Sequence, residues 1–167
     1  MSSIFEIYSK HLNLIDLSEF SKYERSFHNY KYQIYLGNGG SNAISSHIAQ
    51  DACKIHQKYA LSFSDTSMLS CFANDFGYEN IFVEFLKIFS KSETLVILIS
   101  SSGNSQNIIN ALNWCQENNI HFGILTGFDK NNKCRKLSKN HLFDLHVNSD
   151  NYGVVECIHQ ILLHAAI

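Results

Sequence analysis

Several features of familiar protein classes are scarce or missing in this 167-residue sequence. Charged residues make up only 17% and the formal net charge is -2, which argues against a surface for nucleic acid or anionic membranes. The five cysteines are odd in number, and the two nearest, Cys53 and Cys71, are 18 positions apart, which argues against a disulfide framework and a CxxC metal site. The N-terminal stretch has no long apolar run, so we expect neither a signal peptide nor a membrane span, and we expect a cytoplasmic location. Proline is also absent, which excludes no function.

What the sequence does contain is enough apolar material for one globular core, since 45% of its residues are hydrophobic. From about residue 32 onward, short β-rich runs alternate with stretches of helical period, a pattern typical of a parallel sheet covered by helices on both faces. The predicted strands are residues 32–37, 59–64, 94–100, 121–127 and 141–147. The predicted helices are residues 41–57, 65–74, 77–91, 104–118, 133–139 and 151–166.

The segment before the first predicted strand, residues 1–30, has the pattern of one or two amphipathic helices. We expect it to pack on the domain or on a neighbouring subunit. The sequence shows no linker, repeat or low-complexity stretch. It therefore predicts a single α/β domain over residues 1–167, a three-layer α/β/α sandwich with a five-stranded parallel sheet.

Two predicted strands end in loops that suit a small phosphorylated ligand. The first is followed by GNGGS (37–41), whose glycines allow close approach to a ligand, and Ser41 is a plausible helix N-cap. The third ends in SSSGNS (100–105), which places four hydroxyls beside the free N–H groups of a helix start, an arrangement that binds anions. The carboxyl ends of parallel strands meet at one edge of a sheet, so both loops point to one crevice.

A purely structural interpretation of these loops stays open, because glycine turns and serine caps commonly connect strands to helices. Neither loop is a nucleotide fingerprint. GNGGS lacks the GxGxxG spacing and SSSGNS lacks the lysine of a P-loop, which disfavours dinucleotides and nucleoside triphosphates. A hydroxyl-rich cradle without lysine suits a small phosphate monoester.

Histidines and carboxylates recur at helical spacing on two predicted helices. His47 and Asp51 are four positions apart, so they share one face of a helix and can share a metal or a proton. Glu156, Gln160 and His164 fall at i, i+4 and i+8 on the last helix. The chain has nine histidines, however, and such pairs are often plain hydrogen-bonded pairs rather than ligands.

These pieces together resemble a known family. In order and spacing, the chain from about residue 35 onward is similar to the phosphoheptose isomerases, which belong to the sugar isomerase (SIS) class of flavodoxin-like domains. The elements that carry the resemblance are GNGGS, His47 with Asp51, DTS (65–67), AND (73–75) with GYE (77–79), SSSGNS, and Glu156 with His164.

The resemblance implies an aldose-ketose isomerase that converts sedoheptulose 7-phosphate to a heptose 7-phosphate for bacterial heptose biosynthesis. Asp51 and His164 would be the catalytic pair, the carboxylate moving a proton between C1 and C2 of an enediol and the imidazole serving the oxygens. The implied substrate-binding residues are Asn38, Gly39, Gly40, Ser41, Asn74, Asp75, Ser100, Ser101, Ser102, Ser105 and Glu156, with serines 100, 101, 102 and 105 on the phosphate.

The resemblance also implies a metal and an assembly. Several members hold zinc with residues that correspond here to His47, Asp51, Glu156 and His164, a set of nitrogen and carboxylate ligands that zinc accepts. The family forms homotetramers with active sites at subunit contacts. Neither a nucleic-acid nor a membrane partner is expected.

Two positions depart from the family pattern. Asp51 stands where the family has a glutamate, one methylene longer, and a displacement of about 1 Å can cost about a hundredfold in rate. Glu156 stands where the family usually has glutamine, which adds a negative charge that would strengthen binding of a divalent cation.

Two alternative functions stay open on the sequence alone. The chain could be a non-catalytic SIS regulator that binds a sugar phosphate, of the type that binds a replication initiator. It could also isomerise a different sugar phosphate, such as one used in capsule synthesis. The two catalytic positions still hold a carboxylate, Asp51, and an imidazole, His164. A sensor does not need them, so they favour the enzyme.

Overall fold

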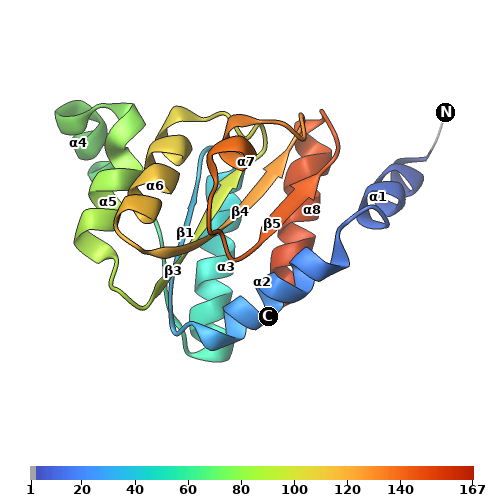
Figure 1. Ribbon diagram of the computed structural model, residues 1–167, viewed down its shortest axis with the longest axis horizontal. Coiled ribbons are helices and arrows are strands. Elements are labelled where there is room, and N and C mark those ends of the chain that lie inside the picture. The colour runs from blue at the N-terminus through green and yellow to red at the C-terminus, as the bar shows by residue number, and fades with distance from the viewer. Residues whose placement is uncertain (1–2) are drawn as a thin grey trace.

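Five parallel strands form one sheet at the centre of the computed structural model, which describes residues 3–167 (Figure 1). They are β1 (Tyr32–Gly37), β2 (Tyr59–Ser62), β3 (Thr94–Ser100), β4 (His121–Gly127) and β5 (Asp144–Val147). Their order across the sheet is β2-β1-β3-β4-β5, and all neighbours pair in parallel. The central strand β3 is buried along its whole length, as its continuous apolar run predicts. The predicted α/β class and five-stranded parallel sheet are confirmed.

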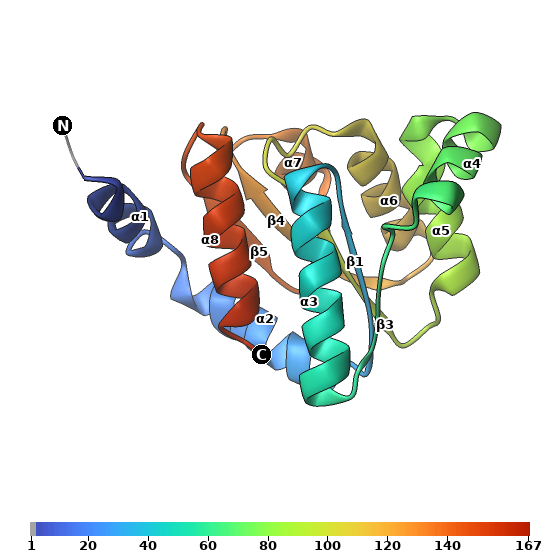
Figure 2. The same ribbon diagram turned by 180° about the vertical axis from the view of Figure 1, so that it is seen from behind.

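Helices cover both faces of this sheet (Figures 1 and 2). The face that Figure 2 turns toward the viewer carries α3 and α8, and α2 completes the same apolar layer. The opposite face carries α5, α6 and α7, with α4 at its end. The helices are α1 (Ile4–Leu12), α2 (Leu17–Asn29), α3 (Gly40–His56), α4 (Thr66–Phe76), α5 (Ile81–Phe89), α6 (Gln106–Glu117), α7 (Lys133–Leu137) and α8 (Tyr152–His164).

Two apolar clusters, one on each face of the sheet, join these layers. On one face, Ile48 of α3 and Ile158 of α8 pack with Ile97 of β3. On the other, Phe82 of α5 and Leu112 of α6 are fully buried against neighbouring strands. Each such side chain contributes about 1.5–3 kcal/mol on burial, so the paired helices are held firmly on the sheet.

The structure differs from the sequence prediction at three element boundaries. The predicted helix 77–91 is interrupted, because Gly77 adopts a φ of 81° and is followed by a 3₁₀ turn, η1 (Tyr78–Asn80), before α5 begins. The second strand ends at Ser62 because the next helix is capped at Asp65. The fifth strand begins only at Asp144, although the amide of Leu142 already donates to the carbonyl of Phe122 at 2.8 Å.

The N-terminal segment contains two helices with different roles. On α2, Tyr23 and Phe27 are fully buried, and the ring of Tyr23 packs edge-on against Phe143 with centroids 5.0 Å apart. No residue of α1 is buried, and Phe5 remains 81% exposed. Residues of α2 thus belong to the apolar core, and Ile7, Tyr8 and Leu12 of α1 pack against it. The single-domain organisation and any contact of this segment with a neighbouring subunit stay predictions. No described helix has the length and apolar character that a membrane crossing requires.

Candidate active site

A pocket of about 250 Å³ opens at the carboxyl ends of β1 and β3, where the two predicted loops meet. The predicted residues that line it are Asn38, Gly39, Gly40, Ser41, Ser100, Ser101, Ser102, Ser105 and Glu156. Ile99 and Tyr152 complete the lining. The pairing of β1 with β3 brings together segments more than 60 positions apart in the sequence, as the crevice rule for parallel sheets predicts.

Two helix starts at this pocket have no side-chain cap. Neither α3, which follows Gly39, nor α6, which follows Ser105, has a hydrogen bond from its N-cap side chain to the first turn. The starts of α4 and α8 are capped by Asp65 and Asn151. An uncapped helix start keeps free N–H groups and the positive end of the helix dipole, so the pocket suits an anion.

The serine loop adds hydroxyl groups to these helix starts. Ser101 is 5% exposed, and its Oγ has no hydrogen-bond partner within residues 3–167. A buried hydroxyl without a partner costs free energy, which a phosphate oxygen would recover. Ser100 donates to Ser105 at 3.3 Å, and Ser102 accepts from the amide of Asn104 at 3.2 Å, so both keep hydrogen-bonding capacity for a ligand.

Glu156 lies in the same pocket, with its carboxylate close to Gly40. A Cβ on Gly40 would overlap the Glu156 carboxylate. The carboxylate accepts no hydrogen bond from any described residue and therefore remains available to a ligand hydroxyl. The sequence predicted Glu156 both as a substrate-binding residue and as a metal ligand, and the structure places it with the substrate-binding residues.

A second group of side chains lies between α3 and α8. Nε2 of His47 is 3.3 Å and Nε2 of His164 is 3.4 Å from Oδ2 of Asp51. The ligand atoms of these three residues all lie within 4.8 Å of one another, and Glu156 is not part of the group. Three of the four predicted metal ligands are thus together. The Asp51 side chain is 13% exposed, whereas His47 is 48% and His164 33% exposed, so the group opens to the surface.

The other ring nitrogens of the two histidines are held by Gln160. Nδ1 of His164 is 2.8 Å from the backbone carbonyl of Gln160. A carbonyl can only accept, so Nδ1 carries a proton and Nε2 is the nitrogen that faces Asp51. The amide nitrogen of Gln160 lies 3.4 Å from Nδ1 of His47. The helical spacing of Gln160 and His164 therefore orients the ring so that Nε2 faces Asp51.

The predicted residues Asn74 and Asp75 do not line the pocket. They lie exposed near the end of α4, where Nδ2 of Asn74 donates to Asp75 at 2.8 Å. The turn η1, which follows α4, does contact a pocket residue, because the hydroxyl of Tyr78 donates to Oδ1 of Asn38 at 2.8 Å. Direct contact of Asn74 and Asp75 with a substrate stays a prediction.

Sequence reasoning missed three residues at the site. Tyr152 lines the pocket at the start of α8, Asn107 pairs with Asn38, and Tyr78 contacts Asn38. Asn107 is a polar residue on a helix face that is otherwise apolar, and this pattern could have pointed to it. In the structure it is 2% exposed, next to the buried Ile108. Tyr78 belongs to the GYE element, which was quoted for the resemblance without a role. Nothing in the sequence singles out Tyr152.

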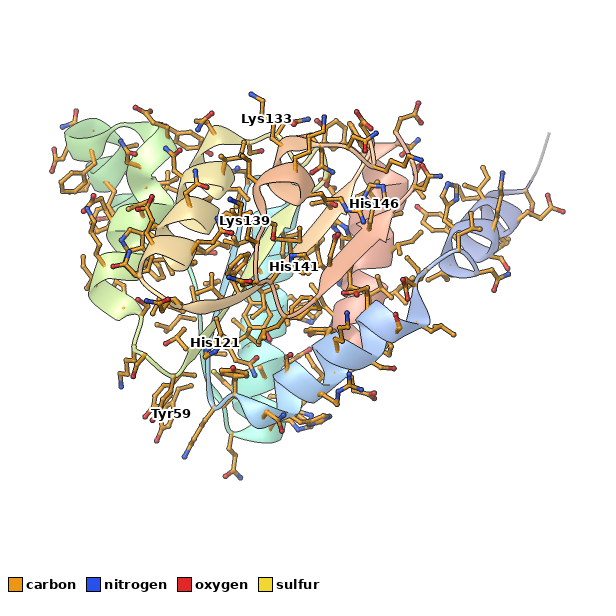
Figure 3. All side chains as sticks on the ribbon, viewed as in Figure 1. Tyr59, His121, Lys133, Lys139, His141 and His146 are labelled. Atoms are coloured by element: carbon orange, nitrogen blue, oxygen red, sulfur yellow. The ribbon has the colours of Figure 1, made fainter. Side chains whose placement is uncertain are left out.

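Most of the nine histidines lie away from the group on α3 and α8. Figure 3 labels His121, His141 and His146, which lie on β4, on β5 and on the segment between them. Fully buried His159 points its Nε2 to the backbone carbonyl of Thr126 at 3.1 Å, and burial lowers its pKa to about 4. His159 therefore stays neutral inside the core and is not a candidate for acid-base catalysis.

The fold, the serine-lined pocket and its position at the strand ends define an SIS domain. The phosphoheptose isomerase of Neisseria gonorrhoeae has the same fold, with a TM-score of 0.84 over 95% of this chain and 88% of that chain at 24% identity. Curated phosphoheptose isomerases are similar in sequence: that of Buchnera aphidicola is 35% identical over 108 residues, and that of Proteus mirabilis 31% over 130 residues. The chain is thus similar in sequence to curated phosphoheptose isomerases and shares the fold of a solved one.

The sequence matches cover only part of this chain and of each relative. The Buchnera match covers 62% of this chain and 56% of the relative, and the Proteus match covers 75% and 65%. The chain thus spans little more than half the length of the first of these relatives. No general protein-family model matches the sequence.

Proposed function

We propose that the protein isomerises a seven-carbon ketose phosphate, sedoheptulose 7-phosphate, to the corresponding aldose phosphate through an enediol. The observation that carries the proposal is that α3 and α8 each contribute to both the anion-binding pocket and the His47, Asp51 and His164 group. On α8 the pocket residue Glu156 and His164 are eight positions apart, a rise of about 12 Å. An extended seven-carbon sugar phosphate has a comparable length, so its phosphate would lie in the pocket and its C1–C2 end near Asp51.

The chemistry required of the protein is proton transfer. Asp51 would take a proton from C1 of the ketose while O2 receives a proton from the His164 imidazolium, which gives a C1=C2 enediol. The Asp51 carboxylic acid would then return the proton to C2 while neutral His164 takes the proton of the C1 hydroxyl, which gives the aldehyde. The proton count balances, and both groups return to their starting states.

The residues of this group also fit a zinc ion. A tetrahedral site with bonds of about 2.0–2.1 Å separates its ligand atoms by about 3.3 Å, and Asp51 Oδ2 lies 3.3 and 3.4 Å from the two imidazole nitrogens. Three protein ligands with a fourth position open is the pattern of catalytic zinc sites. When bound, the ion would polarise the C1 and C2 oxygens and stabilise negative charge on them. We propose His47, Asp51 and His164 as ligands, with Glu156 as the fourth only if its side chain turns from the pocket. An imidazole bound to the ion through Nε2 has no proton to transfer from that atom, so the proton transfer by His164 described above belongs to the site without the ion.

Assembly and cellular context complete the proposal. We expect a homotetramer in which a neighbouring subunit covers the exposed side of His47 and His164. All five cysteines are free thiols, which supports a reducing cytoplasm. The product would enter heptose biosynthesis for lipopolysaccharide or capsule.

The test of the proposed function is a substrate panel. Purified protein, with and without added zinc, is incubated with ketose phosphates of five to seven carbons, and aldose formation is followed. We expect turnover that is highest with the seven-carbon substrate, and the comparison with and without zinc shows whether the ion takes part. Absence of turnover with every sugar, together with tight sugar-phosphate binding, would replace the enzyme with a sugar-phosphate sensor.

A further inference from the structure

The side chain of Asn38, at the end of β1, lines the pocket and is held by residues of two other elements. Asn38 and Asn107 of α6 form a reciprocal pair in which each Nδ2 donates to the other's Oδ1 at 2.9 Å. The hydroxyl of Tyr78 donates to the same Oδ1 of Asn38 at 2.8 Å. The Asn38 amide oxygen therefore accepts two hydrogen bonds and has no lone pair left for a ligand.

The backbone of α6 decides which way this pair is oriented. The amide N–H of Ile108 donates to Oδ1 of Asn107 at 2.9 Å. A backbone N–H can only donate, so the contact fixes which end of the Asn107 amide is the oxygen. Asn107 is 2% exposed, so water does not compete for it. The fixed Asn107 amide then orients Asn38, because the opposite orientation of Asn38 would face oxygen to oxygen and N–H to N–H.

This arrangement leaves one polar group of Asn38 for the pocket. One N–H of its Nδ2 is used by Asn107, and the other has no acceptor among residues 3–167. We propose that Asn107 and Tyr78 are positioning residues that fix Asn38 as a hydrogen-bond donor to the sugar. The pocket would then select a ligand with an oxygen lone pair, a hydroxyl or carbonyl, at this point. The inference rests on the proposed function and deepens it.

Two variants test the positioning role. Tyr78 is 52% exposed, so Tyr78→Phe is expected to fold normally. We expect its affinity for sedoheptulose 7-phosphate, measured by calorimetry, to fall about fivefold, because Asn38 loses one of the three hydrogen bonds that orient its side chain. Asn107→Asp keeps the acceptor for Ile108 but places an oxygen opposite the Asn38 oxygen. We expect a loss of about a hundredfold.

The controls separate positioning of Asn38 from a general effect on the fold. Asn118→Ala removes a hydrogen bond of 2.8 Å to the carbonyl of Trp114 at the other end of α6, away from Asn38 and from the turn that carries Tyr78, and it should leave affinity unchanged. Inorganic phosphate should bind all three variants as it binds wild type, because Asn38 faces the sugar. In an Asn38→Ala background, Tyr78→Phe should cause no further loss, since Tyr78 acts through Asn38.

The outcomes distinguish this inference from the proposed function. Wild-type affinity for the sugar phosphate in both Tyr78→Phe and Asn107→Asp would overturn the positioning role alone. So would an additive loss in the Asn38→Ala background, or an equal loss of inorganic phosphate binding. A wild-type protein that binds inorganic phosphate but no sugar phosphate would overturn both proposals.

Discussion

The pocket at the strand ends and the group on α3 and α8 are built in different ways. Two loops, each a run of neighbouring residues in the sequence, form most of the pocket, Tyr152 and Glu156 of α8 complete it, and two helix starts without a side-chain cap offer backbone N–H groups. The His47, Asp51 and His164 group consists of single side chains from two packed helices, and it remains partly exposed. The pocket is therefore suited to holding a ligand, whereas the group concentrates the titratable chemistry. Ligand binding and proton transfer should be separable by mutation.

The largest expected effect is the loss of turnover when the group of His47, Asp51 and His164 is changed. Asp51→Asn should lower turnover by about 100- to 10 000-fold, because an amide cannot accept the proton. Solvent deuterium should appear at C2 of the aldose made by wild type in deuterated water, and this exchange should be lost in the variant. His164→Gln should have nearly the same effect. Binding of inorganic phosphate should be unchanged in both variants, since the pocket is built separately.

The matched variant Asp51→Glu restores the length of the family's carboxylate. Retained or increased activity would indicate a shortened version of the family site, and loss of activity would indicate a site adjusted to aspartate. Full turnover in Asp51→Asn would show that the proton moves through another group, with Glu156 in the pocket as the next candidate.

The second prediction concerns the stability of the folded protein at low pH, which depends on His159 of α8. Burial lowers the pKa of His159 from 6.5 to about 4, so the folded protein binds fewer protons than the unfolded chain between these values. Stability from neutral His159 is present above pH 6.5 and is lost as the pH falls toward 4, by on the order of 3 kcal/mol. Urea unfolding at pH 7 and pH 4.5 should show the drop, and His159→Gln should reduce it. An equal drop in the variant would assign the acid sensitivity to other groups.

The third prediction concerns Gly103, whose backbone conformation shapes the serine loop of the pocket. Its φ is 63°, and a Cβ there would overlap the side chain of Asn132, which is 3% exposed. Gly103→Ala should lower the free energy of unfolding by about 2–3 kcal/mol and weaken phosphate binding. Chemical denaturation and phosphate titration measure the two effects. Gly153→Ala, at a helix start with more room, is the matched control and should be nearly neutral. Comparable losses in both variants would argue against a special role of the serine-loop backbone.

The smallest effect is expected for single hydroxyls of the pocket. Ser102→Ala and Ser105→Ala should each weaken substrate affinity about tenfold, since a hydrogen bond to a charged group contributes about 1.5–3 kcal/mol and neighbouring donors compensate in part. Turnover at saturating substrate should be nearly unchanged, in contrast to Asp51→Asn. Unchanged affinity for substrate and inorganic phosphate in both variants would place the phosphate elsewhere.

The sequence by itself determined the layered α/β fold, because period-two and helical patterns follow directly from which side chains must be buried. It also determined the two loops, whose residues are local, and the pairing of His47 with Asp51, which one helical turn sets. Only the tertiary structure decided the partners across elements. Packing of α3 against α8 brought His164 to Asp51 and left Glu156 at Gly40, and α6 placed Asn107 against Asn38. These contacts depend on how far each helix slides and rotates on the sheet, which apolar patterning leaves unspecified at the level of single side chains.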